Sequence, residues 1–306
     1  MNRALPPILF ALLFAVPFVP WGRDISSILL LATRIEILAL AALSLDLILG
    51  AGGLVSFGHA AYLAIGAYAV AILDAHDLNE AWIVLPTAMA AAALFAGTTG
   101  AVALRTTGVN FIMITLAFAQ IVFFAAGALS AYGGDDGYPL VERTRVFGAA
   151  VLKGRGFYYA AFVCLAVAYL FSNRLVGSRF GRVLRAIRQN PQRVRAMGFN
   201  PFPVQLTAMV IAGMMCAVAG VLLADLAEFV SPAYGAWQRS GDLLIMVILG
   251  GTGTLHGAIL GAAAVVLLEE FLGRLTEHWR IIYGPFLVLA VLFARGGLAT
   301  IGTRRD

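Results

Sequence analysis

Long apolar runs separated by short polar stretches dominate the chain. Most of the runs approach or exceed the roughly 20 residues with which a helix crosses the hydrocarbon core of a bilayer. The pattern therefore predicts a series of transmembrane helices. The predicted spans lie at about 6–21, 26–49, 54–73, 82–104, 109–131, 157–173, 204–229 and 281–294.

The stretch 242–272 does not fit a single span. It is too long for one relaxed helix, and the glycines and threonines between Gly250 and Gly257 are poor helix formers. We expect the chain to enter the membrane, break here and return, with two short segments near 242–250 and 257–272. Broken helices at membrane depth often mark transport sites. A ladder of small residues also favours tight helix packing, and it consists of Gly253, Gly257 and Gly261. Both interpretations remain open.

Charge supports this membrane topology. Only 12% of the residues are charged, against about a quarter in soluble domains. Seven arginines and no acidic residue lie between Arg174 and Arg195, which places this loop in the cytoplasm by the positive-inside rule. Counting the spans backwards from this loop places Arg3 in the cytoplasm, and a chain that enters the membrane at 242–272 and returns to the same side places Arg304 there as well. The prediction is an all-α polytopic membrane protein with about 8–10 transmembrane helices in one domain, 1–306, and both termini in the cytoplasm.

The composition also argues against several function classes. The net charge of +5 includes a single lysine, Lys153, which is atypical of a surface that binds nucleic acid. The glycine-rich segment from Gly250 to Gly257 lacks the lysine of a phosphate-binding loop. His59 and His256 stand alone, without further ligands at metal-binding spacing. We expect no catalytic residues, no metal and no cofactor.

The arginine-rich loop, about 174–202, has its own helical pattern. An apolar face of Phe180, Leu184 and Ile187 alternates with arginines, which predicts an amphipathic helix. Asn190-Pro191 is a typical helix start, and Gly198 is a typical helix end. A helix of about 191–197 is too short to be stable alone. It needs a surface to pack on, either a soluble partner or anionic lipid headgroups.

Several charged residues lie within or beside predicted spans. Arg34, Glu36 and Asp46 lie in or near the second span, where charge usually faces protein or water. We interpret them as ion pairs that hold helices together, with a proton relay as the alternative. Asp225 and its neighbours near the outer face are interpreted as solvated charges, with contact to an external partner as the alternative; the set is Asp225, Glu228 and Asp242.

A series of motifs occurs in a specific order. It comprises Gly52–Tyr62, Asn110–Gln120, Gly133–Gly137, Ser178–Arg188, Ala196–Gly198, Val247–Thr254 and Arg295–Leu298. Together, over about residues 38–298, these motifs resemble the branched-chain amino-acid (LivM-type) permeases of bacterial ATP-binding cassette importers. The resemblance implies a subunit of the bacterial inner membrane that moves branched-chain or related hydrophobic amino acids. Permeases for urea or short amides share much of the pattern. A passive channel or ion-coupled carrier is the alternative outside the family.

The resemblance also implies partners and sites. The partners are a second homologous permease subunit, two cytoplasmic ATPase subunits, a periplasmic solute-binding protein and membrane lipid. The residues expected to couple to the ATPase are Arg179, Gly181, Arg182, Arg185, Arg188, Pro191, Val194, Ala196, Met197 and Gly198. The residues expected along the substrate pathway are Ser56, Gly58, His59, Thr115, Gly134, Gly137, Gly250, Gly251 and Gly253. Relatives carry acidic residues where this chain reads Gln189 to Arg195, so we expect an acidic groove on the partner ATPase.

Overall fold

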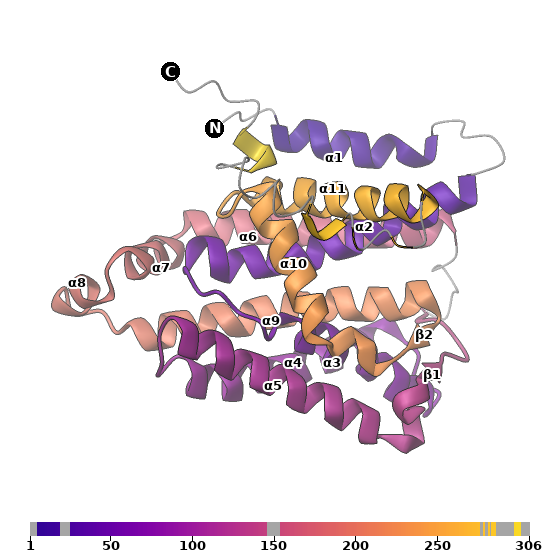
Figure 1. Ribbon diagram of the computed structural model, residues 1–306, viewed down its shortest axis with the longest axis horizontal. Coiled ribbons are helices and arrows are strands. Elements are labelled where there is room, and N and C mark those ends of the chain that lie inside the picture. The colour runs from indigo at the N-terminus through magenta and orange to yellow at the C-terminus, as the bar shows by residue number, and fades with distance from the viewer. Residues whose placement is uncertain are drawn as a thin grey trace.

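The computed structural model describes residues 5–18, 25–145, 154–275, 278, 281, 283–285 and 297–300. Most of its helices lie side by side along one direction (Figure 1). The helices are α1 (Leu5–Ala15), α2 (Ile25–Asp46), α3 (His59–Asp74), α4 (Ala81–Ala103), α5 (Val109–Ala128), α6 (Arg155–Gly177), α7 (Arg179–Gln189), α8 (Pro191–Ala196), α9 (Pro201–Ala227), α10 (Trp237–Gly250) and α11 (Leu255–Leu275). Within the described residues, six helices are long and apolar enough to cross a membrane, namely α2, α4, α5, α6, α9 and α11. The all-α polytopic prediction is confirmed.

Helices α2 and α9 form the centre of the bundle. Of the 18 most apolar consecutive residues in each helix, 78% are buried in α2 and 67% in α9. Only 22% are buried in α4 and in α5. A helix that is apolar on all sides is typical of such a central position. Small residues allow α3 to approach α9: a Cβ atom added at Gly220 would lie 2.1 Å from the carbonyl oxygen of Leu63.

Two predicted segments differ from the structure. Helix α3 begins at His59, and residues 54–58 before it are not helical. With 16 residues, α3 is about 24 Å long, shorter than the roughly 30 Å hydrocarbon core. The prediction of a short segment at 257–272 is wrong, because α11 has 21 residues and is long enough to span. Most of the predicted span 281–294 lies outside the described residues.

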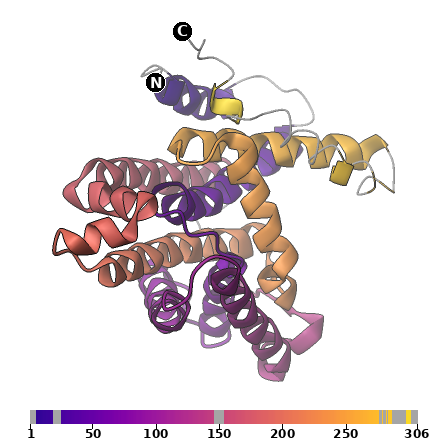
Figure 2. The ribbon, with the colours of Figure 1, turned by 60° about the vertical axis from the view of Figure 1, so that its left-hand side comes forward.

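The predicted break between 250 and 255 is confirmed. Helix α10 has 14 residues and crosses the direction of the other helices (Figures 1 and 2). It then packs closely on α11. A Cβ atom at Gly250 would lie 1.9 Å from the carbonyl oxygen of Gly257, and one at Gly261 would lie 1.8 Å from that of Met246. Tight packing through glycines is therefore confirmed for this helix pair.

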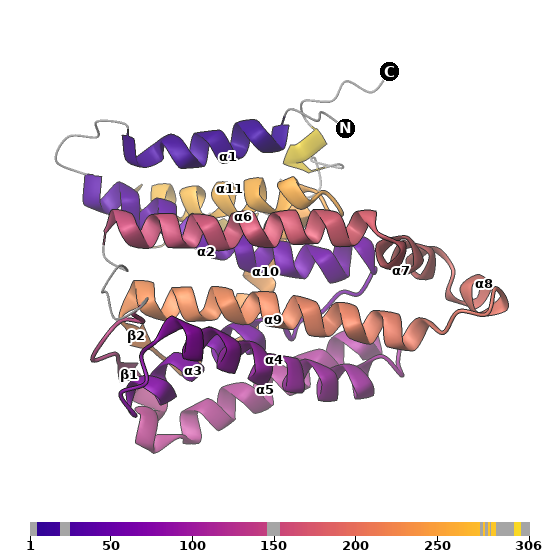
Figure 3. The same ribbon diagram turned by 180° about the vertical axis from the view of Figure 1, so that it is seen from behind.

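The two ends of the bundle differ. Helices α7 and α8 extend beyond the bundle at one end, and the short strands β1 (Tyr138–Pro139) and β2 (Phe229–Val230) lie at the other (Figures 1 and 3). The strands are antiparallel, with Tyr138 opposite Val230. Helix α1 begins at the end that carries α7 (Figures 1 and 3). If the arginine-rich end is cytoplasmic, the β1–β2 end is the outer face.

Candidate functional site

Helix α7 is amphipathic, as predicted. The Ser178 hydroxyl caps its start by accepting a hydrogen bond from the amide of Gly181 at 3.4 Å. Leu184 and Ile187 are buried against the bundle. Arginines occupy the opposite, exposed face, and they are Arg179, Arg182 and Arg185. The apolar face thus attaches α7 to the transmembrane helices and leaves the cationic face free for a partner or for lipid headgroups.

Helix α8 forms where the sequence predicts it. The Asn190 side chain accepts a hydrogen bond from the amide of Arg193 at 2.9 Å, Pro191 occupies the first turn, and Gly198 follows with a positive φ of 86°. The predicted coupling role of Val194 stays a prediction, and the structure shows how this side chain packs. Val194 is only 2% exposed, so the helix packs against its own chain and is stabilised there.

The exposed apolar residues of this region follow α8. Met197 is 59% exposed and Phe199 is 53% exposed. Arg193 and Arg195 are exposed on the preceding turn, as are Pro191 and Ala196. The tip of this projection therefore presents apolar side chains beside positive charge, a composition suited to a protein partner.

Arg188 differs from the other arginines of α7. The residue is exposed, but its guanidinium donates a hydrogen bond to the carbonyl oxygen of Gly50. Gly50 belongs to the wide helical turn Leu47–Ala51 that extends α2. Carbonyl groups at a helix C-terminus lack partners within the helix, and a cation there is favourable. Arg188 therefore links α7 to the end of α2.

The end of α2 also contacts the break between α10 and α11. The Asp46 carboxylate accepts a hydrogen bond from the amide of Gly253 at 2.7 Å. A Cβ atom at Gly50 would lie 2.5 Å from both the Asp46 Oδ1 atom and the Gly253 Cα atom. Gly251 is buried against Gly297, whose added Cβ atom would lie 2.3 Å from the Gly251 Cα atom. Predicted pathway residues Gly250, Gly251 and Gly253 thus lie together in a junction with α2.

A second group of predicted residues meets at the start of α3. The Thr115 hydroxyl of α5 accepts a hydrogen bond from the amide of Phe57 at 3.2 Å, and the Ser56 hydroxyl accepts one from the amide of Gly58 at 3.2 Å. His59 is fully buried, with its Nε2 atom 3.0 Å from the Ser44 hydroxyl. This contact gives the buried His59 ring a polar partner on α2. Ser240 of α10 joins this group, because its hydroxyl accepts a hydrogen bond from the amide of Ala60 at 3.0 Å.

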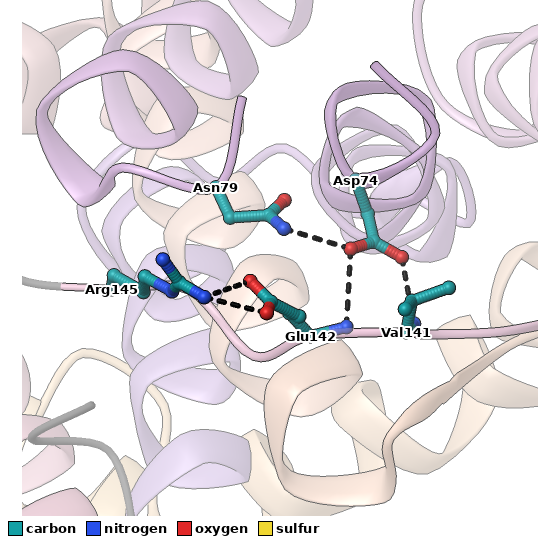
Figure 4. Close-up of polar contacts among 5 residues, drawn as sticks. All are labelled: Asp74, Asn79, Val141, Glu142 and Arg145. Atoms are coloured by element: carbon teal, nitrogen blue, oxygen red, sulfur yellow. Dashed lines mark hydrogen bonds and ion pairs between the residues drawn. The ribbon is translucent and has the colours of Figure 1, made fainter. Parts of the chain in front are cut away.

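At the β1–β2 end of the bundle, Asp74 organises a loop that is distant in sequence. Its carboxylate accepts hydrogen bonds from the amides of Val141 at 2.8 Å and Glu142 at 3.2 Å, and from the Asn79 side chain at 2.9 Å (Figure 4). Glu142 forms an ion pair with Arg145 beside it (Figure 4). Partial desolvation and the nearby Asp74 and Asp77 carboxylates raise the pKa of Tyr138 in this loop, so its phenol stays neutral.

The interpretation of Asp225 as a solvated charge is wrong. Asp225 is fully buried, and its Oδ1 atom accepts hydrogen bonds from the amide and the hydroxyl of Thr144, both at 3.0 Å. Glu228 accepts a hydrogen bond from Arg143 at 2.6 Å. Predicted pathway residues Gly134 and Gly137 lie beside β1, apart from the other predicted residues, and Gly137 packs against Phe229 and Val230.

The charges of the second span are partly explained by helix pairing. Arg34 forms an ion pair with Glu269 of α11 at 3.0 Å, as predicted for helix assembly. Glu36 is fully buried beside Tyr158 of α6. Among the described residues, no group of three or more His, Cys, Asp or Glu side chains is arranged to hold a metal ion.

Comparison with known proteins identifies the family. Residues 27–293 match the family described as branched-chain amino acid transport system / permease component. The chain belongs to this family. It is 30% identical over 294 residues to the high-affinity branched-chain amino acid transport system permease protein LivM of Escherichia coli K12, which covers 88% of this chain and 69% of the relative. The LivM protein of Salmonella typhimurium is 28% identical over 292 residues, with the same coverage.

The family includes permeases with other named solutes. The autoinducer 2 import system permease protein LsrC of Photorhabdus luminescens is 32% identical to this chain over 141 residues, 44% of this chain and 41% of the relative. No solved structure matches the chain. The chain is thus a multi-pass membrane protein and a transport permease, and the family leaves its solute open.

Proposed function

We propose that this permease is the membrane subunit of an importer that a separate ATPase drives through α8 and the residues that follow it. The supporting observation is the exposed pair Met197 and Phe199 at the tip of the arginine-rich projection. Apolar side chains of this size at an aqueous surface favour a protein partner over lipid headgroups. The exposed arginines beside them favour an acidic groove on that partner.

Force on the tip has a direct route into the bundle. Helix α8 packs on α9, and α9 contacts α2, α3 and α4. Protein interiors are close-packed and transmit displacement. Nucleotide-driven closure of two ATPase subunits is expected to push α8 and tilt α9, which opens the pathway alternately to the outside and the cytoplasm. A second homologous permease subunit completes the pathway, and a periplasmic binding protein delivers the solute.

The non-helical segments at 53–58 and 251–254 are the proposed lining of the pathway. Both contain exposed or partly exposed residues within a membrane bundle. Irregular backbone at membrane depth is tolerated where it faces protein or a water-filled path. The expected solutes are branched-chain or related hydrophobic amino acids, in line with the names of the LivM relatives. Both termini are proposed to lie in the cytoplasm of a bacterial inner membrane.

The coupling proposal is tested by adding charge to the tip. Met197→Asp with Phe199→Asp is expected to abolish co-purification of the ATPase while the permease still folds, because both side chains are exposed. Val141→Asp is the matched control. Val141 is 80% exposed in the outer loop, and its substitution should leave ATPase binding unchanged. Full retention of the ATPase by the double variant would refute the proposed docking site.

The solute is identified by uptake competition. Proteoliposomes with all subunits are loaded with ATP and given labelled leucine in the presence of excess valine, urea, a short amide or autoinducer 2. Competition by valine alone supports the amino-acid proposal. Competition by urea or the amide, or by autoinducer 2, would assign the permease to that solute instead.

A further inference from the structure

We infer that Arg188 is a positioning residue that transmits the movement of the cytoplasmic helices to the broken segment between α10 and α11, through Gly50 and Asp46. The inference rests on the proposed function and names the internal link that this function requires. Arg188 then lies between the proposed ATPase-binding tip and the proposed pathway, and it does not act at the ATPase contact alone.

The first step is the contact between α7 and α2. The Arg188 guanidinium donates to the Gly50 carbonyl oxygen across 138 residues of sequence. Its aliphatic stem covers Gly53, where an added Cβ atom would lie 2.7 Å from the Arg188 Cγ atom. Gly53 has a positive φ of 70°, a conformation that glycine adopts readily. The backbone is thus shaped to seat this arginine.

The second step runs from α2 to the broken segment. Asp46 is 1% exposed, and its Oδ1 atom holds the amide of Gly253 at 2.7 Å. Its Oδ2 atom has no hydrogen-bond partner among the described residues. Gly50, which accepts the hydrogen bond from Arg188, lies against this carboxylate, because its added Cβ atom would be 2.5 Å from the Asp46 Oδ1 atom. Arg188 and Asp46 therefore meet at the same turn of α2.

The third step is the close packing of the two backbone segments that these contacts join. Gly50 approaches Gly253 so closely that an added Cβ atom would overlap the Gly253 Cα atom at 2.5 Å. The segment 251–254 is also bounded by Gly297, packed on Gly251. Because no side chain separates the two backbones, a shift of the α2 terminus displaces the broken segment directly. Packed contacts of this kind switch between discrete arrangements instead of deforming gradually.

The experiment measures solute uptake and ATP hydrolysis together in proteoliposomes that contain all subunits. The unaltered permease must show ATP-dependent uptake. If it does not, the proposed function itself is refuted. In Arg188→Ala, ATP hydrolysis is expected to continue while the number of solutes moved per ATP falls about tenfold, the effect of losing one hydrogen bond to a charged group. Arg188→Lys should restore part of the ratio. Arg105→Ala, an exposed arginine between α4 and α5, should leave it unchanged.

A double-variant comparison separates one linked route from two independent effects. Asp46→Asn keeps an oxygen acceptor for Gly253 but removes the charge, and it should also lower the ratio. If both residues act in one route, the double variant should be no worse than the more impaired single variant. Multiplied losses, or an unchanged ratio in Arg188→Ala beside working unaltered permease, would overturn the inference.

A distance measurement keeps the inference testable if Arg188→Ala does not assemble with its partners. Spin labels are attached at Gln189→Cys and Thr252→Cys, both exposed positions, after Cys164→Ala and Cys216→Ala remove the native thiols. With Arg188 present, nucleotide should leave this distance narrow and unchanged, because the two segments move together. A distance that changes with nucleotide would contradict the inference.

Discussion

The packing of α10 on α11 gives a quantitative prediction. In Gly261→Ala, the new Cβ atom would lie 1.8 Å from the Met246 carbonyl oxygen, whereas real Cβ atoms stay beyond about 3.0 Å from such neighbours. The helices must therefore separate by roughly 1 Å, and overpacking of this kind costs about 1–3 kcal/mol. Alanine recovers at most about 1 kcal/mol of helix propensity. We expect a net loss of about 1 kcal/mol in the free energy of unfolding.

Gly273→Ala on the same helix is the matched control. No atom lies within 4 Å of its added Cβ atom, so alanine should be neutral or should stabilise the permease by up to about 1 kcal/mol. The assay is reversible unfolding of the purified permease in mixed detergent and SDS, followed by tryptophan fluorescence. Equal stability of the two variants would refute the argument that glycine is required for the approach of α11 to α10.

Three further predictions concern polar contacts. Asp74→Ala should speed amide hydrogen exchange in the loop 138–145 by more than tenfold, because it removes three hydrogen bonds to a carboxylate. Unchanged exchange in this loop, measured by mass spectrometry, would contradict the prediction. Arg34→Leu should lower the yield of folded permease by leaving the Glu269 charge unpaired, and adding Glu269→Leu should restore it, as gel filtration will show. Asn190→Ala should destabilise α8 by about 1 kcal/mol through loss of its cap. Limited proteolysis near this helix should then be faster than in the unaltered protein, and an equal rate would contradict the prediction.

Local sequence signals predicted the elements that depend on local chemistry. Asn190, Pro191 and Gly198 bounded α8 correctly, and the glycines after residue 249 placed the break between α10 and α11. These features follow from backbone conformation and capping, which neighbouring residues decide. For the same reason, the amphipathic pattern of α7 indicated which of its faces is buried.

Contacts between residues that are far apart in the sequence could not be predicted from local patterns. The burial of Val194 depends on where its own chain packs, whereas the pattern alone left a soluble partner and lipid headgroups open as the surface for this helix. Asp225 reads as a charge at the end of a span, but Thr144, 81 residues earlier, encloses it. Likewise, the inward bond of Arg188 depends on an unpaired carbonyl 138 residues away. Such pairings require the three-dimensional arrangement of the helices.

The claim that a separate ATPase drives this permease is tested most directly by uptake of labelled leucine into proteoliposomes. The proteoliposomes contain the permease, its partner permease and the binding protein, with and without the ATPase subunits. We predict uptake only when the ATPase and ATP are both present, and loss of uptake in Met197→Asp with Phe199→Asp. Leucine uptake by the permease subunits without ATPase or nucleotide would contradict the claim that a separate motor drives this bundle through the tip beyond α8.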